Sequence, residues 1–231
     1  MKKSKGYLII HKFRVGKKLI VKNRKLIIVP IFHASEEVLT KLMLYRKSRS
    51  KPKLQEMPKW EDLTRSFWRS VRLRLLETIE SENPKKIKVY QDSADAIWTK
   101  NFLRTASKFS ENYAILLELA EMGATLLKTE SRKLLDRTGS LIKSLNITEN
   151  EEEIDKLFLN LRRLSKKRDK WISKNIDKTL AKDELGILFI GVAHEVEKHL
   201  PKDIQVKKIE CEEVKNFLQL REILSQCSEV E

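Results

Sequence analysis

The stretch LGILFIGVAH at residues 185–194 decides the fold class. Its apolar residues continue almost without a break to Ala193, as in a strand with both faces buried, and a long helical pattern over residues 149–181 precedes it. Similar short apolar runs alternate with helical patterns upstream, and they predict strands at 26–32, 87–90 and 124–128. Because this alternation is typical of crossover units, we expect an α/β protein with a mostly parallel sheet flanked by helices.

The N-terminal part of the chain predicts two further features. Residues 7–14 and 18–32 are rich in β-branched residues with turn residues between them, which indicates a short N-terminal β-hairpin leading into the buried strand. Pro30 should lie near the end of that strand, because proline cannot donate to a central ladder. The basic, proline-containing segment 47–58 is expected to be a loop or lid inserted into a single domain covering residues 1–231.

Helices are predicted where apolar residues recur with helical spacing between these strands. They are expected at 35–46, 59–82, 94–109, 111–122, 131–145 and 149–181, followed by a strand at 204–209 and a terminal helix from Glu212. Pro58 should begin the second of these helices, and Gly123 should cap the fourth.

The chain is strongly basic, with a formal net charge of +15 that would attract polyanions such as nucleic acids. Acidic and basic residues are interspersed in most helices, so an ordinary solvated surface explains the charge equally well. The apolar runs are too short to span a bilayer and no signal-peptide core is present, so we expect a cytoplasmic protein. Cys211 and Cys227 form no CxxC pattern, and we expect them to be reduced thiols.

Ionisable side chains follow four of the predicted strands at the point where each strand ends. His33 follows VPIF, Asp92 follows KVYQ, Glu130 follows LLKT and His194 follows FIGVA. Because ligands of open α/β sheets bind at the carboxyl ends of the strands, these residues are candidates for a divalent-metal site or for general acid–base catalysis. The alternative is structural: each histidine could simply pack, and Asp92 or Glu130 could cap the following helix.

Arg168 is a further candidate, on the long helical segment before the strand that starts at Gly186. Trp171, Ile172, Ile176 and Leu180 are interpreted as the buried stripe of that helix, and Arg168 lies one turn before Ile172 on the same face. An arginine facing the sheet could bind a substrate anion or orient a carboxylate. A basic surface cluster is the alternative.

The segment RDKWISKNIDKTLAKDELGILFIGVAH, residues 168–194, resembles the closing segment of the TraB/ChaN/Tiki-like (erythromycin-esterase-like) superfamily. In that superfamily an arginine-bearing helix leads into an apolar strand and a G-x-x-H motif, which Gly191 to His194 match. A second such motif near the N-terminus corresponds here to Pro30-Ile31-Phe32-His33, with proline in place of glycine. Glu130 is similar to a glutamate that family members carry after a strand. The resemblance implies a metal-dependent protease or esterase, or a haem-binding protein.

Taken together, these features favour a metal-assisted hydrolase. His33, Glu130 and His194 would bind a divalent metal or share acid–base work, Asp92 would assist, and Arg168 would hold a possibly anionic substrate or a carboxylate. No phosphate loop, dinucleotide fingerprint or nucleophilic-serine motif accompanies them.

Two other functions stay open. The first is a non-catalytic nucleic-acid-binding protein that uses loop 47–58 and helix 59–82, where Arg65, Arg69 and Arg72 lie near Trp68. The second is a partner-binding or haem-carrying protein in which the histidines are axial ligands.

Overall fold

The computed structural model describes residues 24–31, 60–210 and 212. The predicted N-terminal β-hairpin, the helix at 35–46, the loop at 47–58 and the terminal helix beyond Glu212 lie outside these residues, as do both cysteines.

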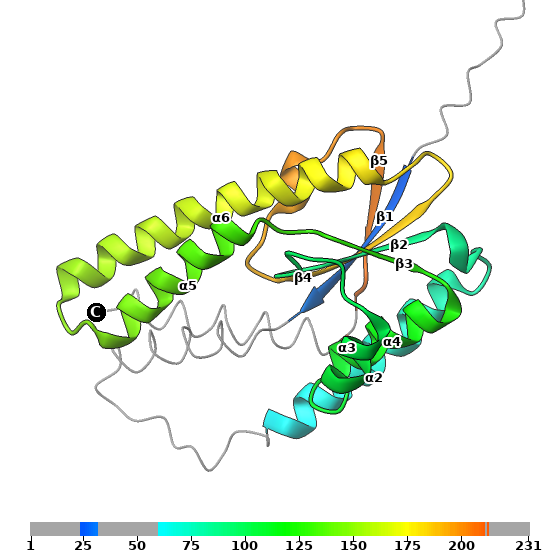
Figure 1. The fold of residues 1–231 in the computed structure, drawn as a ribbon, viewed down its shortest axis with the longest axis horizontal. Coiled ribbons are helices and arrows are strands. Elements are labelled where there is room, and N and C mark those ends of the chain that lie inside the picture. The colour runs from blue at the N-terminus through cyan, green and yellow to red at the C-terminus, as the bar shows by residue number, and fades with distance from the viewer. Residues whose placement is uncertain (1–23, 32–59, 211, 213–231) are drawn as a thin grey trace, which may run out of the picture.

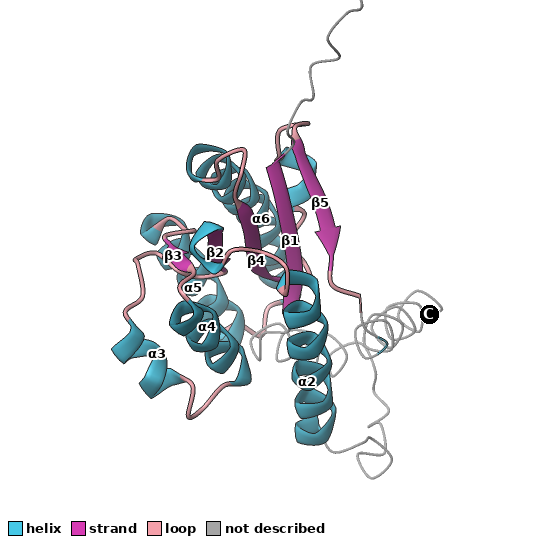
Figure 2. Cartoon of the chain, turned by 90° about the vertical axis from the view of Figure 1, so that its right-hand side faces the viewer, coloured by secondary structure: helices cyan, strands magenta, loops and turns pink. Residues whose placement is uncertain are grey.

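The core of the fold is a five-stranded sheet with the strand order β3-β2-β4-β1-β5. Every pair of neighbouring strands is parallel, which confirms the predicted α/β class. In Figure 2 the strands lie side by side from β5 at one edge to β3 at the other. The strands are β1 (Arg24–Ile31), β2 (Ile87–Gln91), β3 (Thr125–Leu127), β4 (Leu185–Gly191) and β5 (Ile204–Lys208).

Helices lie on both faces of this sheet (Figure 1). The helices are α2 (Trp60–Ile79), η2 (Pro84–Lys86), α3 (Lys100–Ala106), α4 (Glu111–Met122), α5 (Arg132–Ile147), α6 (Glu151–Thr179) and η3 (Val196–His199). Among the described helices, none has the length and apolar composition needed to cross a bilayer.

Strand β4 lies at the centre of the sheet, and all of its residues are buried. This explains its nearly continuous apolar sequence, because both of its faces contact helices. The neighbouring strand β1 contains Pro30 near its end, as predicted. Pairing of β1 with β5 stops at Ile28, so the proline lies beyond the last residue that needs to donate to β5.

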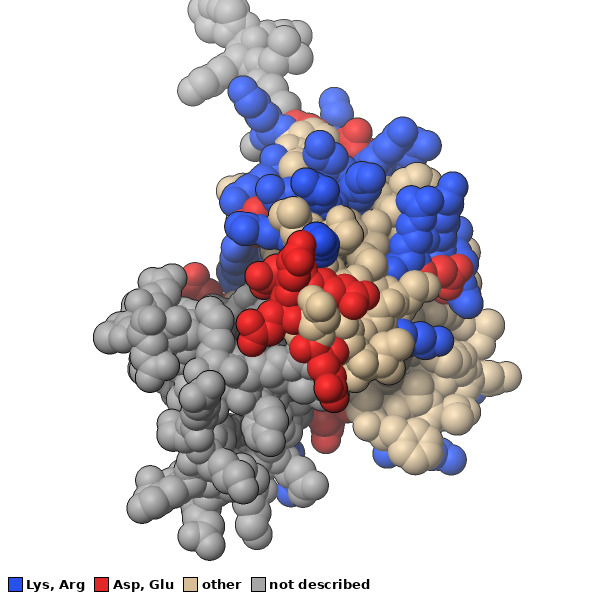
Figure 3. Space-filling view, turned by 90° about the vertical axis from the view of Figure 1, so that its left-hand side faces the viewer, with Lys and Arg blue, Asp and Glu red and all other residues tan. Residues whose placement is uncertain are grey.

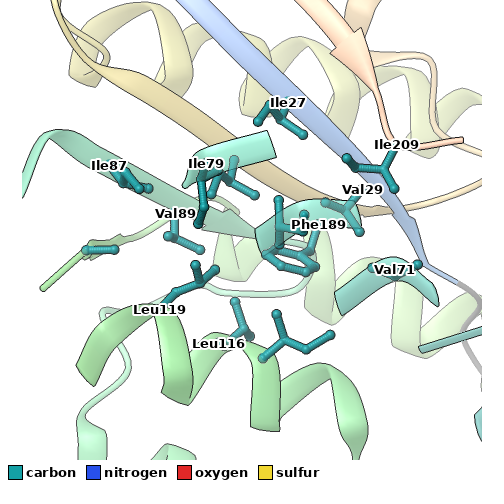
Figure 4. Packing of buried hydrophobic residues seen from close by; sticks show 14 of the residues in the cluster. Ile27, Val29, Val71, Ile79, Ile87, Val89, Leu116, Leu119, Phe189 and Ile209 are labelled. Carbon is teal, nitrogen blue, oxygen red and sulfur yellow. The ribbon is translucent and has the colours of Figure 1, made fainter. Parts of the chain in front are cut away.

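Two apolar clusters hold the helices to the sheet. In the larger cluster, side chains of α2 and α4 pack on one face; Figure 4 shows Val71, Leu116 and Leu119 converging on Phe189 and Val89. In the smaller cluster, on the other face, Ile172, Ile176 and Leu180 pack against β-strand residues. Within this cluster, only the C-terminal half of the long helix α6 and the residue that follows it contact the sheet.

The structure corrects two details of the sequence interpretation. The helix predicted at 94–109 shortens to α3, because Ala94 is part of a turn and Thr99 caps the helix by accepting from the Phe102 amide. Trp171 was assigned to the buried stripe of α6, but 42% of it is exposed. Successive residues of a helix are about 100° apart, so Trp171 lies at the solvent edge of the stripe that Ile172 occupies.

The boundary at Gly123 agrees with the prediction. This residue ends α4 with a φ of 114°, in the left-handed region, and its amide donates to the carbonyl of Ala120. Glycine adopts this conformation without a steric penalty, which is why it ends the helix here.

Candidate active site

Asp92, Glu130 and His194 lie in the loops that follow β2, β3 and β4, and α6 supplies Arg168 from the neighbouring layer. One backbone group ties two of these loops together. The carbonyl of Ala94 accepts from the amides of Thr129 and Glu130, both at 2.9 Å. Because parallel strands end at one edge of a sheet, the three loops meet there.

Arg168 holds two buried carboxylates at once. Its Nη2 lies 2.6 Å from Asp92 Oδ1 and 2.6 Å from Glu130 Oε1, while its Nε donates to the same Glu130 oxygen at 3.1 Å. All three side chains are buried. The guanidinium therefore holds Asp92 and Glu130 in place through its Nε and Nη2.

Besides Arg168, two groups hold the Asp92 carboxylate in place. The Gly191 amide donates to its Oδ2 at 3.2 Å, and the hydroxyl of Ser93 lies 3.2 Å from its Oδ1. Ser93 itself has a φ of 65°, which is uncommon for a residue with a side chain. Such backbone strain persists where the surroundings hold it in place, and here it turns the chain sharply after Asp92.

His194 pairs with Asp169, the residue after Arg168 on α6. Its Nδ1 is hydrogen-bonded to Asp169 Oδ1, and Asp169 Oδ2 accepts from the Glu195 amide at 3.1 Å. The His194 side chain is only 5% exposed, and its Nε2 lies 3.6 Å from Asp92 Oδ2. A carboxylate bonded to Nδ1 fixes the tautomer of the ring, so that Nε2 is the nitrogen available to accept a proton.

The charges of the site act on the proton affinity of His194. Burial lowers the pKa of this imidazole, but the hydrogen bond that its ring donates to Asp169 and the negative charge of Asp92 outweigh burial, so the pKa is raised above its ordinary value. Burial also raises the pKa of the Glu130 carboxyl, and the ion pair with Arg168 works against that shift. The site as a whole thus favours a proton on His194.

A metal site cannot be completed from the described residues. Among them, no three histidine, cysteine or carboxylate side chains lie together in an arrangement that could hold an ion. Glu130 has one buried oxygen, Oε2, without a hydrogen-bond partner, but its other oxygen is bound to Arg168. The third predicted ligand, His33, lies outside the described residues, so the metal stays a prediction that depends on it.

Four of the five predicted site residues are thus brought together: Asp92, Glu130, Arg168 and His194. The role of Asp169 was missed. The sequence holds a signal for it, because Asp169 precedes Ile172, Ser173 and Ile176 at helical spacing and is therefore an acid in an otherwise buried row. A carboxylate at such a position needs a partner, and the partner is His194.

Comparisons of the chain with protein-family models, with curated proteins and with solved structures give no match. The resemblance to the TraB/ChaN/Tiki-like superfamily therefore stays an expectation, and the functional argument rests on the geometry of this site.

Proposed function

We propose that the chain is a hydrolase in which His194 is the general acid–base group at the carboxyl ends of the strands. The observation that carries this proposal is the buried Asp169–His194 pair, with the free ring nitrogen turned towards Asp92. An imidazole oriented by a carboxylate is the usual means of moving a proton in hydrolytic reactions. A histidine with a shifted pKa and a specific carboxylate partner is typical of functional sites.

The geometry supports a simple reaction sequence. In the neutral form of His194, Nε2 and Asp92 Oδ2 are acceptors 3.6 Å apart, so one water molecule can donate a hydrogen bond to each of them. His194 removes a proton from that water as its oxygen bonds to an electrophilic carbon, and Asp169 stabilises the imidazolium. The imidazolium then gives the proton to the leaving group as the bond to that group breaks.

The charge balance of the site favours a neutral substrate. Asp92, Glu130 and Asp169 supply three buried carboxylates against the guanidinium of Arg168, whose Nε and Nη2 already bind two of them, so the carboxylates outnumber the cations even when His194 is protonated. An anionic substrate would meet repulsion at this place, whereas an ester or amide carbonyl would not. We therefore propose carbonyl substrates in place of the anionic ones that the sequence allowed.

The experiment is a hydrolysis screen with chromogenic esters, peptides and phosphodiesters, using wild type, His194→Ala and His199→Ala. We expect ester or peptide hydrolysis that His194→Ala reduces by about 100-fold or more, since a general base contributes this much. His199 is a matched control because it is exposed and its side chain makes no hydrogen bond or ion pair with the described residues, while its backbone carbonyl accepts from the Ser173 hydroxyl. Equal hydrolysis by wild type and His194→Ala would contradict the proposal.

The metal prediction has its own measurement. The metal content of purified wild type would be compared with that of His33→Ala and His194→Ala by mass spectrometry. Stoichiometric metal that both variants lose would establish that the two histidines share one metal site. Hydrolysis by protein free of metal would show that the Asp169–His194 pair acts without a metal ion.

The second predicted function was nucleic-acid binding through helix 59–82, in which Trp68 would stack on a base. The structure does not leave Trp68 accessible for this. Trp68 is buried and lies edge-on to Phe67 at 4.9 Å between ring centroids, so it offers no face to a base. Arg72 on the same helix is paired with Glu118. The basic loop 47–58 lies outside the described residues. The described part of helix 59–82 thus lacks the stacking aromatic residue on which this prediction relied.

A further inference from the structure

The exposed cations of the described chain fall into two groups. Many are neutralised by an acid close by, as in the pairs Arg72–Glu118, Lys86–Asp183, Arg104–Glu121 and Arg132–Asp95. The exposed cations of α6 between Arg163 and Lys178 differ, because they form no ion pair with a described residue, whereas the buried Arg168 on the inner face is bound to Asp92 and Glu130. Other exposed cations of the described chain, such as Lys100 and Lys108, also lack an ion pair, so the α6 cations are distinguished by their arrangement along one helix.

Four of these cations form one continuous row with an exposed aromatic residue. Spacings of four, four, three and four residues place neighbours on adjacent turns of one helix face. All members of the row are exposed: Arg163, Lys167, Trp171, Lys174 and Lys178. The row is about 22 Å long at the rise of an α-helix. Trp171 thus lies between two lysines, one turn away on either side.

A groove between α5 and α6 lies beside the N-terminal end of this row. Its volume is about 560 Å³, and Arg163 and Lys167 line it together with Arg137 of α5. Asp136, the acid in this lining, is engaged by Arg132 at 3.0 Å. Asn160 and Ser140 add polar groups to the wall. The groove is therefore cationic and can form hydrogen bonds.

The charge is also segregated on the surface. Figure 3 looks onto the end of the α5–α6 hairpin and shows acidic side chains gathered in one patch and Lys and Arg side chains massed beside it. The first turn of α6 contributes Glu151, Glu152 and Glu153 to the acidic side, while the row begins farther along the helix. A polyanion would thus be attracted to the row and repelled from the hairpin end.

We propose that this row, with the groove beside it, binds single-stranded nucleic acid. The cations contact successive phosphates, and the indole of Trp171 stacks on an unpaired base. Single-strand binding surfaces combine these two features, because every base has a face that can stack and every nucleotide carries a charge. A duplex hides its base faces from the indole, and an anionic membrane would call for a broad apolar helix face where the row has a single aromatic residue.

The test measures fluorescence anisotropy of labelled oligothymidylate and oligouridylate with the full chain, over a range of salt concentrations. We expect binding that weakens with salt, with a log–log slope of about −3 for four or five phosphate contacts. Arg163→Glu/Lys167→Glu should weaken binding about 10-fold or more, because each reversal replaces an attraction with a repulsion. Trp171→Ala should weaken it about 5- to 100-fold without changing the slope, because stacking releases no counterions.

A charge-matched control lies on the opposite face of the sheet. Lys100→Glu/Lys108→Glu changes the net charge equally but alters exposed lysines at and beyond α3, and it should bind within about 2-fold of wild type. His194→Ala should also bind like wild type, which separates this surface from the proposed hydrolytic site. Circular dichroism of each variant verifies the fold.

Three results would overturn the proposal. The first is no binding by wild type at low salt, and the second is an equal loss in the α6 and α3 double variants. The third is a preference for duplex DNA or for phosphatidylserine vesicles over the single strands, because neither offers Trp171 an unpaired base.

Discussion

At the scale of single residues, the site depends on pairs in which one partner sets the state of the other. Asp169 should control the proton affinity of His194 through the Nδ1 hydrogen bond and its charge. Asp169→Asn keeps the shape of the side chain but removes the charge, so the pKa of His194 should fall. NMR titration of the His194 ring protons measures this directly and needs no substrate. An unchanged or higher pKa would show that Asp169 does not orient a proton-carrying imidazole.

Arg168 should be the largest single contributor to the stability of the site. Replacing it by methionine leaves Asp92 and Glu130 buried without a counter-charge, which costs about 3–5 kcal/mol in comparable cases. Urea denaturation measures the loss. Arg72→Met is the matched control, because it breaks the pair with Glu118 on an exposed helix face and should cost less than about 1 kcal/mol. Similar losses in both variants would contradict the assigned role of Arg168.

At the scale of elements, two glycines in different surroundings should respond in opposite ways to alanine. In Gly186 of β4, a Cβ would lie 2.6 Å from Leu26 Cδ1 and 3.2 Å from Leu180 Cδ2, inside the smaller apolar cluster. Overpacking there should destabilise the fold by about 1–3 kcal/mol. In Gly139 of α5 a Cβ meets nothing within 4 Å, and alanine should stabilise the helix by about 0.5–1 kcal/mol. Thermal unfolding of Gly186→Ala and Gly139→Ala measures both effects, and a stabilised Gly186→Ala would refute the close packing of Gly186 against Leu26 and Leu180.

The elements also show what the sequence can and cannot predict. Strand β4 was predictable because burial on both faces leaves a nearly continuous apolar run, and Asp92, Glu130 and His194 follow from the rule that parallel strands end together. The pairing of His194 with Asp169 depends on the rotation of α6 against the sheet, which no local pattern specifies. The same rotation exposes Trp171, whose sequence spacing alone placed it with the buried Ile172.

At the scale of the whole molecule, the two proposals place different chemistry on different sides of α6. The inward residues Arg168 and Asp169 complete a buried, acid-rich site at the sheet, while the outward residues Lys167 and Trp171 belong to an exposed, cationic row. Neighbouring positions of one helix can serve both because they are about 100° apart. If both hold, the helix links a nucleic-acid surface to a hydrolytic site, and a variant of one side should leave the other intact.

The buried site should also give the folded molecule a distinct dependence on pH. A histidine whose pKa is higher in the folded chain binds its proton more tightly there, so it stabilises the fold at pH values below its ordinary pKa, near 6.5, and loses this contribution as the pH rises through the raised pKa. The pKa of Glu130 is also raised in the folded chain, so this carboxyl also stabilises the fold less as the pH rises. Its contribution begins to fall at a lower pH, because the ordinary pKa of a glutamate is lower than that of a histidine. We therefore expect the free energy of unfolding to decrease as the pH rises above about 6.5. Urea denaturation across this range should show the decrease in wild type and a flatter profile in His194→Gln. Because Glu130 remains in that variant, an equally steep decrease in both proteins would assign the effect to the carboxyl and would remove His194 as the group that titrates.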